Sequence, residues 1–141
     1  MKMLTAMEKQ LLRKKLYEYE GKIEHMYKDT KGYITVGVGH LVKDLSAAQK
    51  LNFIHQTTGK KATKDEIKID FESVKKSPAG LFASLYKKNT KLKLATLTID
   101  QLTDSHIDSF EKELNQIYGV VEFMRFPTDV KLALFDMIFN L

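Results

Sequence analysis

Hydrophobic residues along most of the chain recur three and four positions apart, the period of an α-helix. Between Leu4 and Leu16 they alternate with charged residues in that spacing, which predicts an amphipathic helix. Gly21 follows, and glycine is common just beyond a helix C-terminus because it enters the left-handed backbone region without steric cost. The helix is therefore expected to end near Glu20, with Glu20 in its last turn.

The period changes to two between Ile23 and Val38. Ile34 and Val36 alternate with polar or small residues there, and turn-forming residues at 28–32 separate two short runs. This pattern predicts an antiparallel β-hairpin.

After the hairpin the helical period returns and continues to the end of the chain. The segment 89–97 is basic and is expected to be a loop whose leucines, Leu92, Leu94 and Leu97, point inward. The other expected elements are a helix from Ser46 through Ile54, a helix opened by the capping box Thr63-Lys64-Asp65-Glu66 and halted before Pro78, a short helix or turn at 81–85, a capped turn at 98–101, a helix from Ser105 to Tyr118 closed by Gly119, and a helix from Pro127 to Leu141.

These elements predict an α+β fold that is mostly helical, with one small antiparallel sheet near the N-terminus. The 141 residues, 43% of them hydrophobic, suit a single domain with a real core. We expect one domain over 1–141, with an N-terminal helix and hairpin lobe at 1–60 and a helical lobe at 61–141.

Charge and cysteine content narrow the classes of partner and site. The formal net charge of +5 favours anionic partners such as nucleic acid, a membrane surface or the bacterial cell wall, but a merely solvated cationic face explains it equally well. The same two interpretations apply to the lysine-rich stretch 87–93. Cysteine is absent and His25, His55 and His106 lack ligand-like spacing, so neither a metal site nor a cofactor is expected.

The candidate catalytic groups are two carboxyl groups and one hydroxyl. Glu20 falls at the expected helix end, whereas Asp29 and Thr35 fall in the hairpin. Glycoside cleavage needs one carboxyl group to protonate the departing oxygen and another to manage water or act as nucleophile. The competing interpretation is structural: a lone glutamate at a helix end is usually solvated, and an aspartate in a Lys-Asp-Thr-Lys turn usually caps that turn.

The stretch that contains these residues closely resembles the signature of the phage-type (T-even) lysozymes, which are glycoside hydrolases of peptidoglycan. The segments 63–66 and 133–141 also look like segments of that family. The residues that carry the signature are Glu20-Gly21, Tyr27-Lys28-Asp29-Thr30, Gly32-Tyr33 and Thr35-Val36-Gly37-Val38-Gly39-His40-Leu41.

The resemblance implies a lysozyme-like fold and a muramidase that cuts the β-1,4 bond between N-acetylmuramic acid and N-acetylglucosamine. Glu20 matches the general acid, Asp29 the ionised carboxylate that stabilises positive charge and orients a water, and Thr35 the residue that helps to place that water. The expected mechanism is inverting. Leu41 and Phe139 match positions that line the saccharide cleft, although core packing is an equal alternative for Phe139.

The segment from about Ser77 to Phe126 departs from compact phage members of the family. It resembles lysozyme domains of bacterial effectors that contractile secretion machines export. We therefore expect a protein made in the cytoplasm without a signal peptide, acting on the wall in the periplasm after phage lysis or export. Neither membrane insertion nor nucleic-acid binding is expected.

The family continues past the position of Leu141, so we expect the chain to be a truncated piece. An apolar terminal helix would then be exposed and would be covered by an immunity protein or by a second copy of the chain. Its expected exposed residues are Phe135, Ile138, Phe139 and Leu141. The alternative function is a non-hydrolytic fragment that binds peptidoglycan or docks on a partner.

Overall fold

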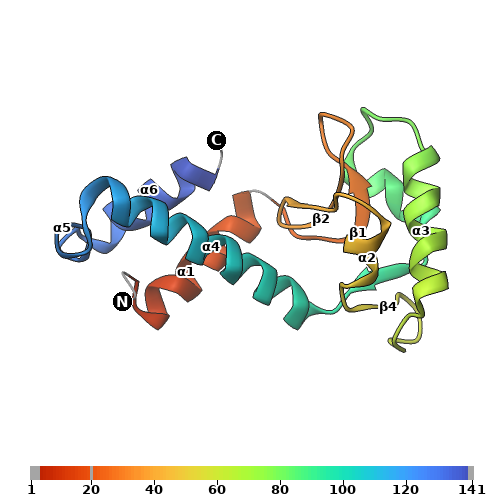
Figure 1. The fold of residues 1–141 in the computed structure, drawn as a ribbon, viewed down its shortest axis with the longest axis horizontal. Helices are drawn as coiled ribbons and strands as arrows, with labels where there is room; N and C mark the ends of the chain where they lie inside the picture. Colours follow the sequence, from red (N-terminus) through yellow and green to blue (C-terminus); the bar gives the residue numbers. More distant parts are fainter. Residues whose placement is uncertain (1–3, 20, 140–141) are drawn as a thin grey trace. The chain divides into compact units, whose positions relative to one another are not determined.

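The computed structural model describes residues 4–19 and 21–139, with side chains through Met137. The fold is α+β, with a small antiparallel sheet near the N-terminus as predicted (Figure 1). Its elements are α1 (Ala6–Tyr19), β1 (Ile23–Lys28), β2 (Ile34–Gly37), β3 (His40–Leu41), α2 (Leu45–Gln49), β4 (Phe53–His55), α3 (Lys64–Lys76), the 3₁₀ helix η1 (Ala83–Asn89), β5 (Leu92–Leu94), α4 (Thr96–Tyr118), α5 (Val120–Met124) and α6 (Thr128–Phe139). None of the helices described is long and apolar enough to cross a bilayer.

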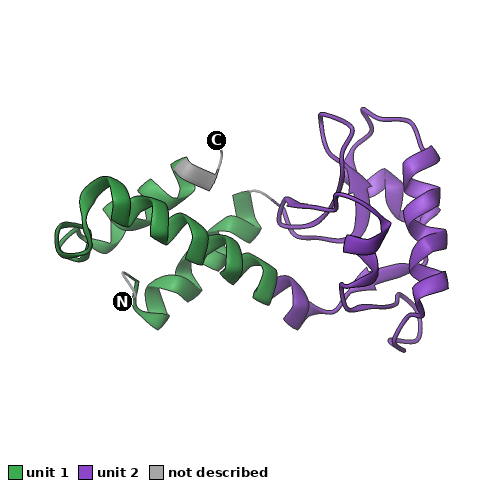
Figure 2. Cartoon of the chain, viewed as in Figure 1, with its two compact units in different colours: residues 1–20, 101–141 green, residues 21–100 purple. Residues whose placement is uncertain are grey.

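Contacts divide the chain into two compact units, coloured separately in Figure 2. Unit 1 combines residues 1–20 with residues 101–141, and unit 2 comprises residues 21–100. This division differs from the predicted lobe boundary at residue 60. Packing of α1 against α6 joins segments from the two ends of the sequence, and periodicity along a chain carries no information about such pairings.

In unit 1, Glu8 connects the start of α1 to α6. Its Oε1 accepts a hydrogen bond from the Thr5 backbone N–H (3.1 Å), and the Thr5 hydroxyl accepts one from the Glu8 N–H (3.1 Å), which forms a capping box. The same carboxylate accepts the Thr128 hydroxyl at 2.8 Å and lies 3.3 Å from the Lys131 ammonium. Glu8 and Lys131 are both buried, so this is a buried ion pair with additional hydrogen bonds.

Glu8 should make the free energy of unfolding depend on pH in the acid range. Burial raises the pKa of its carboxyl, but the hydrogen bonds from Thr5, Thr128 and Lys131 outweigh burial and leave the pKa below its ordinary value of 4.5. The stabilisation is therefore complete above pH 4.5 and is lost as the pH falls through the lower folded-state pKa. Urea unfolding at a series of pH values should show a steeper acid loss for the wild type than for Glu8→Gln. Parallel curves would contradict this assignment.

The C-terminal helix buries an aromatic residue that the sequence suggested would be exposed. Phe135 is buried, and its ring centroid lies 5.9 Å from that of Phe123 in an edge-to-face arrangement. The expectation of an exposed Phe135 is therefore wrong, because the short helix α5 supplies a partner for it. Met137 on the same helix is exposed. The other expected members of that surface lie outside the described side chains: Ile138, Phe139 and Leu141.

Unit 2 contains the predicted hairpin and a third short strand. β1 pairs with β2 and β2 pairs with β3, both antiparallel, with Thr35 opposite Leu41 and Val36 opposite His40. Val36 is fully buried. The strand β3 is too short to show an alternating pattern, which is why the sequence did not predict it.

A second small sheet forms where the sequence predicted a helix and a loop. β4 overlaps the end of the helix expected from Ser46 through Ile54, and β5 falls inside the expected loop at 89–97; the two pair antiparallel. Short apolar runs fit either a helix or a strand, so a distant pairing partner decided the outcome. Leu92 and Leu94 are buried as predicted, but Leu97 is 67% exposed and its inward placement was wrong.

The helix α4 is longer than predicted. The sequence suggested a capped turn at 98–101 followed by a separate helix from Ser105, whereas α4 runs without interruption over Thr96–Tyr118. Ile99, Ile107 and Leu114 are buried along it. The polar residues between the two predicted pieces include no glycine or proline, so nothing there ends the helix.

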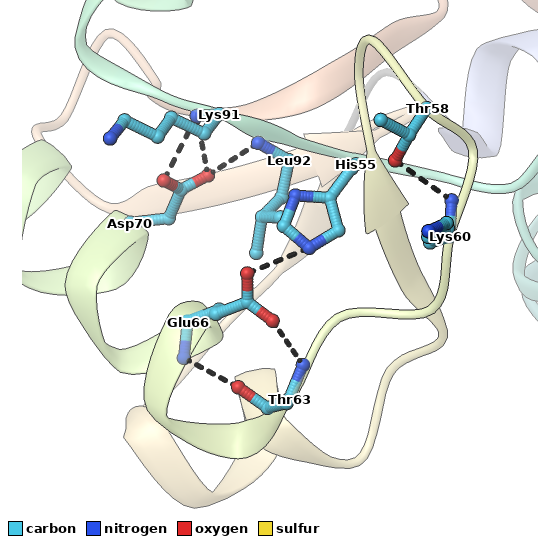
Figure 3. Close-up of polar contacts among 8 residues, drawn as sticks. All are labelled: His55, Thr58, Lys60, Thr63, Glu66, Asp70, Lys91 and Leu92. Carbon is cyan, nitrogen blue, oxygen red and sulfur yellow. Dashed lines mark hydrogen bonds and ion pairs between the residues drawn. The ribbon is translucent and has the colours of Figure 1, made fainter.

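A buried carboxylate joins α3 to the second sheet (Figure 3). The predicted capping box is present, since the Glu66 side chain accepts from the Thr63 N–H (2.9 Å) and the Glu66 N–H donates to the Thr63 hydroxyl (3.2 Å). Farther along α3, the Asp70 carboxylate accepts the backbone N–H of Lys91 (3.0 Å) and of Leu92 (2.9 Å). Asp70 thus fixes the beginning of β5.

Asp70→Ala should destabilise the protein by about 2–4 kcal/mol. The change leaves the N–H groups of Lys91 and Leu92 without their acceptor, and each buried donor left unpaired costs ~1–3 kcal/mol. Chemical denaturation followed by circular dichroism measures the loss. Lys68→Ala removes an exposed side chain from the same helix and should change stability by less than about 0.5 kcal/mol. Equal losses for the two variants would show that Asp70 holds nothing in place.

Candidate active site

The turn between β1 and β2 fixes the Asp29 side chain. Its Oδ1 accepts hydrogen bonds from the backbone N–H groups of Lys31 and Tyr33, both at 2.9 Å. The turn is closed by the Gly32 N–H, which donates to the Asp29 carbonyl, and by the Asp29 N–H, which donates to the Tyr33 carbonyl. Gly32 has a φ of +84°, a conformation that favours glycine. The aspartate is therefore built into the turn, as the structural interpretation of this residue predicted.

The turn uses only Oδ1 of Asp29, so the second carboxylate oxygen, Oδ2, is available for chemistry. Hydrogen bonds from two N–H groups to Oδ1 set the plane of the carboxylate. No described residue donates a hydrogen bond to Oδ2. Asp29 is half-buried, so a bound molecule can reach the side chain. A fixed and partly exposed carboxylate of this kind can orient a water or face a developing positive charge.

Thr35 is linked to Asp29 through the backbone of one residue, Tyr33. The buried Thr35 hydroxyl donates to the Tyr33 carbonyl at 3.0 Å, while the Tyr33 N–H donates to Asp29. Because its proton is used in this way, the Thr35 oxygen retains lone pairs that can accept a hydrogen bond from a water. The predicted site residues Asp29 and Thr35 are thus both held by hydrogen bonds to the backbone of Tyr33.

Leu41 lies beside Thr35 on the sheet. The two are directly opposite in the β2–β3 register, and directly opposite residues project from the same face. Leu41 is 43% exposed and lines a hollow of about 540 Å³, a volume typical of small-ligand sites. The hollow mixes apolar and charged side chains, including Tyr33, Ile34, Lys43, Asp44, Phe71 and Glu72.

Lys28, the last residue of β1, anchors the strand end that precedes Asp29. Its ammonium donates to the carbonyls of Lys75 (2.9 Å) and Ser77 (2.6 Å), where α3 ends. A cation at a helix C-terminus is electrostatically favourable because the last carbonyl groups point toward it. The contact ties the hairpin to α3 and holds the turn in place.

Lys28→Met should therefore destabilise the protein by about 1–3 kcal/mol, because two charge-assisted hydrogen bonds are lost while the aliphatic stem is retained. Urea unfolding measures the change. Lys31→Met removes the same charge from the same turn, but Lys31 contributes only its backbone N–H to the bonds described above, so it should be nearly neutral. A neutral Lys28→Met would disprove the anchoring role.

Of the five predicted site residues, the structure places Thr35 and Leu41 opposite each other on one small sheet and Asp29 in the turn that joins β1 to β2. Of these three, Leu41 lines the hollow, whereas Asp29 and Thr35 do not. Glu20 lies outside the described residues, as does the side chain of Phe139 at the end of α6. Sequence reasoning missed the supporting roles of Tyr33 and Lys28. Tyr33 acts through its backbone N–H and carbonyl, so the identity of the residue at position 33 gives no signal for this role.

Comparison of the sequence with models of protein families and with curated proteins gives no match. Over the described residues, no group of three or more His, Asp or Glu side chains could hold a metal ion. The assignment of the site therefore depends on the chemistry and geometry of its own residues.

Proposed function

We propose that the chain is a muramidase that hydrolyses the β-1,4 bond between N-acetylmuramic acid and N-acetylglucosamine in bacterial peptidoglycan. The observation that supports this most is the shared attachment of the Asp29 carboxylate and the Thr35 hydroxyl to Tyr33. A carboxylate and a hydroxyl that are both held by the backbone of one residue suit the placement of one water molecule. The resemblance of the surrounding stretch to phage-type lysozymes, and the α+β fold, support a lysozyme-like fold as part of the proposal.

In the proposed mechanism Glu20 protonates the departing glycosidic oxygen. The ionised Asp29 stabilises positive charge at the sugar carbon, and Asp29 and Thr35 together hold the water that attacks the opposite face. The product then has inverted anomeric configuration, which requires the two carboxyl groups to lie ~6.5–9.5 Å apart so that the water fits between them. Leu41 and Phe139 are proposed to contact the sugar faces.

The proposed place of action is the cell wall in the periplasm, reached after phage lysis or by export through a secretion machine. An immunity protein or a second copy of the chain is the proposed partner of α6. Since Phe135 is buried, the apolar residues that α6 offers such a partner include Val130 and Met137, which are exposed.

A second candidate is a lysozyme-like module that binds peptidoglycan without cutting it. The observation that favours it is the use of Asp29 Oδ1 by the turn, because a capping aspartate explains the residue without any catalytic role. The two candidates differ in what they release from the wall.

The discriminating experiment incubates the purified chain with isolated sacculi. A muramidase releases soluble muropeptides, and NMR of the nascent products should show the inverted anomer; Glu20→Gln should release none while circular dichroism stays unchanged. Protein that sediments with sacculi but releases no sugar ends would overturn the muramidase in favour of the binding module.

A further inference from the structure

The net positive charge of this protein comes from unit 2. Residues 21–100 contain 15 lysines against 8 acidic residues, a net +7, whereas residues 1–20 and 101–141 contain 8 basic against 10 acidic residues, a net −2. The excess of +5 is therefore concentrated on one unit. Such asymmetry points to a local anionic ligand more than to general solubility.

Part of this charge lines a concave site away from the hairpin turn. A hollow of about 310 Å³, which we call the lysine groove, is formed by the start of β1, by η1 and by β5. An adjoining hollow shares Gln56, Ser84 and Lys87 with it and adds Lys88. The polar side chains that define the lysine groove are Lys22, Glu24, Gln56, Ser84, Lys87 and Lys93.

The floor of the lysine groove is held by hydrogen bonds. His25 Nε2 lies 2.8 Å from the Ala83 carbonyl and joins β1 to the start of η1. The Gln56 side-chain amide donates to the Thr90 hydroxyl (3.0 Å) and to the Leu92 carbonyl (2.9 Å). Both amide protons of Gln56 are thus engaged and its side-chain carbonyl remains an acceptor. A fixed floor of this kind is suited to binding a ligand without reordering of the backbone.

The positive charge of the groove comes from its lysines. Burial lowers the pKa of His25, although the hydrogen bond with Ala83 acts in the opposite direction, so the imidazole is neutral near neutral pH. One acidic side chain in the lining, Glu24, lies 3.7 Å from Lys93. The groove therefore offers an excess of ammonium donors together with one carboxylate acceptor.

We propose that the lysine groove binds the carboxylate groups of the short peptide stems that peptidoglycan carries, with Glu24 and Gln56 accepting hydrogen bonds from amide or amine groups of the same peptide. This inference depends on the proposed function for the identity of the polymer. A single-stranded nucleic acid fits less well, because no Phe, Tyr or Trp is among the described residues that line the groove to stack on a base.

The position of the groove separates peptide binding from bond cleavage. Strand β1 leads from Glu24 to Lys28, the residue before Asp29, and four steps along an extended strand span roughly 13 Å. A carboxylate bound at the Glu24 end of the strand is thus held away from the proposed reacting atoms. Substitutions in the lysine groove should weaken binding of the stem peptide and raise the KM for peptidoglycan that carries it. The kcat on peptide-free glycan should be unchanged.

The test uses stem peptides released from sacculi by an amidase, titrated into the full chain and followed by calorimetry. Lys87→Ala with Lys93→Ala should weaken binding about 10-fold, since two charge-assisted contacts are removed. Lys60→Ala with Lys61→Ala removes the same charge from exposed lysines of the same unit that do not line the groove, and should weaken it less than about twofold. Circular dichroism verifies that all variants are folded.

This experiment does not need hydrolysis, so its outcome is independent of the muramidase assay. Saturable peptide binding that is lost in the groove variant supports the inference even if no bond is cut. Absent binding, equal loss in both lysine pairs, or tighter binding of a glycerol-phosphate polymer or a single-stranded oligonucleotide than of the peptides would overturn it, even if the enzyme is active.

Discussion

Asp29→Asn is expected to reduce the rate of peptidoglycan cleavage by at least about 10²–10³-fold while leaving the hairpin folded. Asparagine keeps a side-chain oxygen that can accept the N–H groups of Lys31 and Tyr33, so the turn persists. What it loses is the negative charge proposed to stabilise the sugar carbon. The measurement is the initial rate of soluble muropeptide release from sacculi, with unfolding curves to establish that stability is unchanged.

Asp44→Asn provides the matched control. Asp44 lines the same hollow as Leu41, and its carboxylate accepts the Ala47 N–H at 2.8 Å to cap α2. Asparagine caps a helix about as well as aspartate, so this variant removes an equal charge with little structural cost. Its rate should remain within about twofold of the wild type. Similar losses in the two variants would mean that the loss of any negative charge in this part of unit 2 lowers the rate and that Asp29 has no special role.

Lys131→Met is expected to destabilise the protein by about 3–5 kcal/mol, the largest effect on stability that the structure predicts. The substitution leaves Glu8 buried next to the apolar methionine, without the ammonium that neutralises it. Removing one partner of a buried ion pair is costly, because the remaining charged group is buried away from water and no longer has an opposite charge beside it. Urea denaturation of the full chain at neutral pH measures the loss.

Two further variants establish that the effect comes from the pair. Lys112→Met removes an exposed charge from α4 in the same unit and should change stability by less than about 0.5 kcal/mol. Adding Glu8→Gln to Lys131→Met should restore part of the loss, because no buried charge remains. A double variant less stable than Lys131→Met alone would contradict the pair as the cause.

Local signals in the sequence were sufficient for several elements. Gly32 and the polar residues around it specify the turn of the hairpin, and Thr63 with Glu66 specifies the start of α3. In both cases the residues that decide the structure lie within a few positions of each other, so the chemistry can be read directly from their order.

Other elements depended on partners far along the chain. Phe53 and Leu94 are opposite each other in a sheet, and neither run is long enough to show a strand by its own period. Phe135 is buried because Phe123 lies against it. For the site, side-chain chemistry indicated Asp29 and Thr35, but the link between them passes through backbone atoms of Tyr33, which no residue pattern marks.

Mass spectrometry of the fragments released from intact sacculi tests the muramidase proposal most directly. The wild type should produce muropeptides with new N-acetylmuramic acid reducing ends, and Asp29→Asn should produce almost none while Asp44→Asn produces them at a near-normal rate. Fragments that carry new N-acetylglucosamine reducing ends, or no fragments at all from the folded wild type, would contradict the proposal.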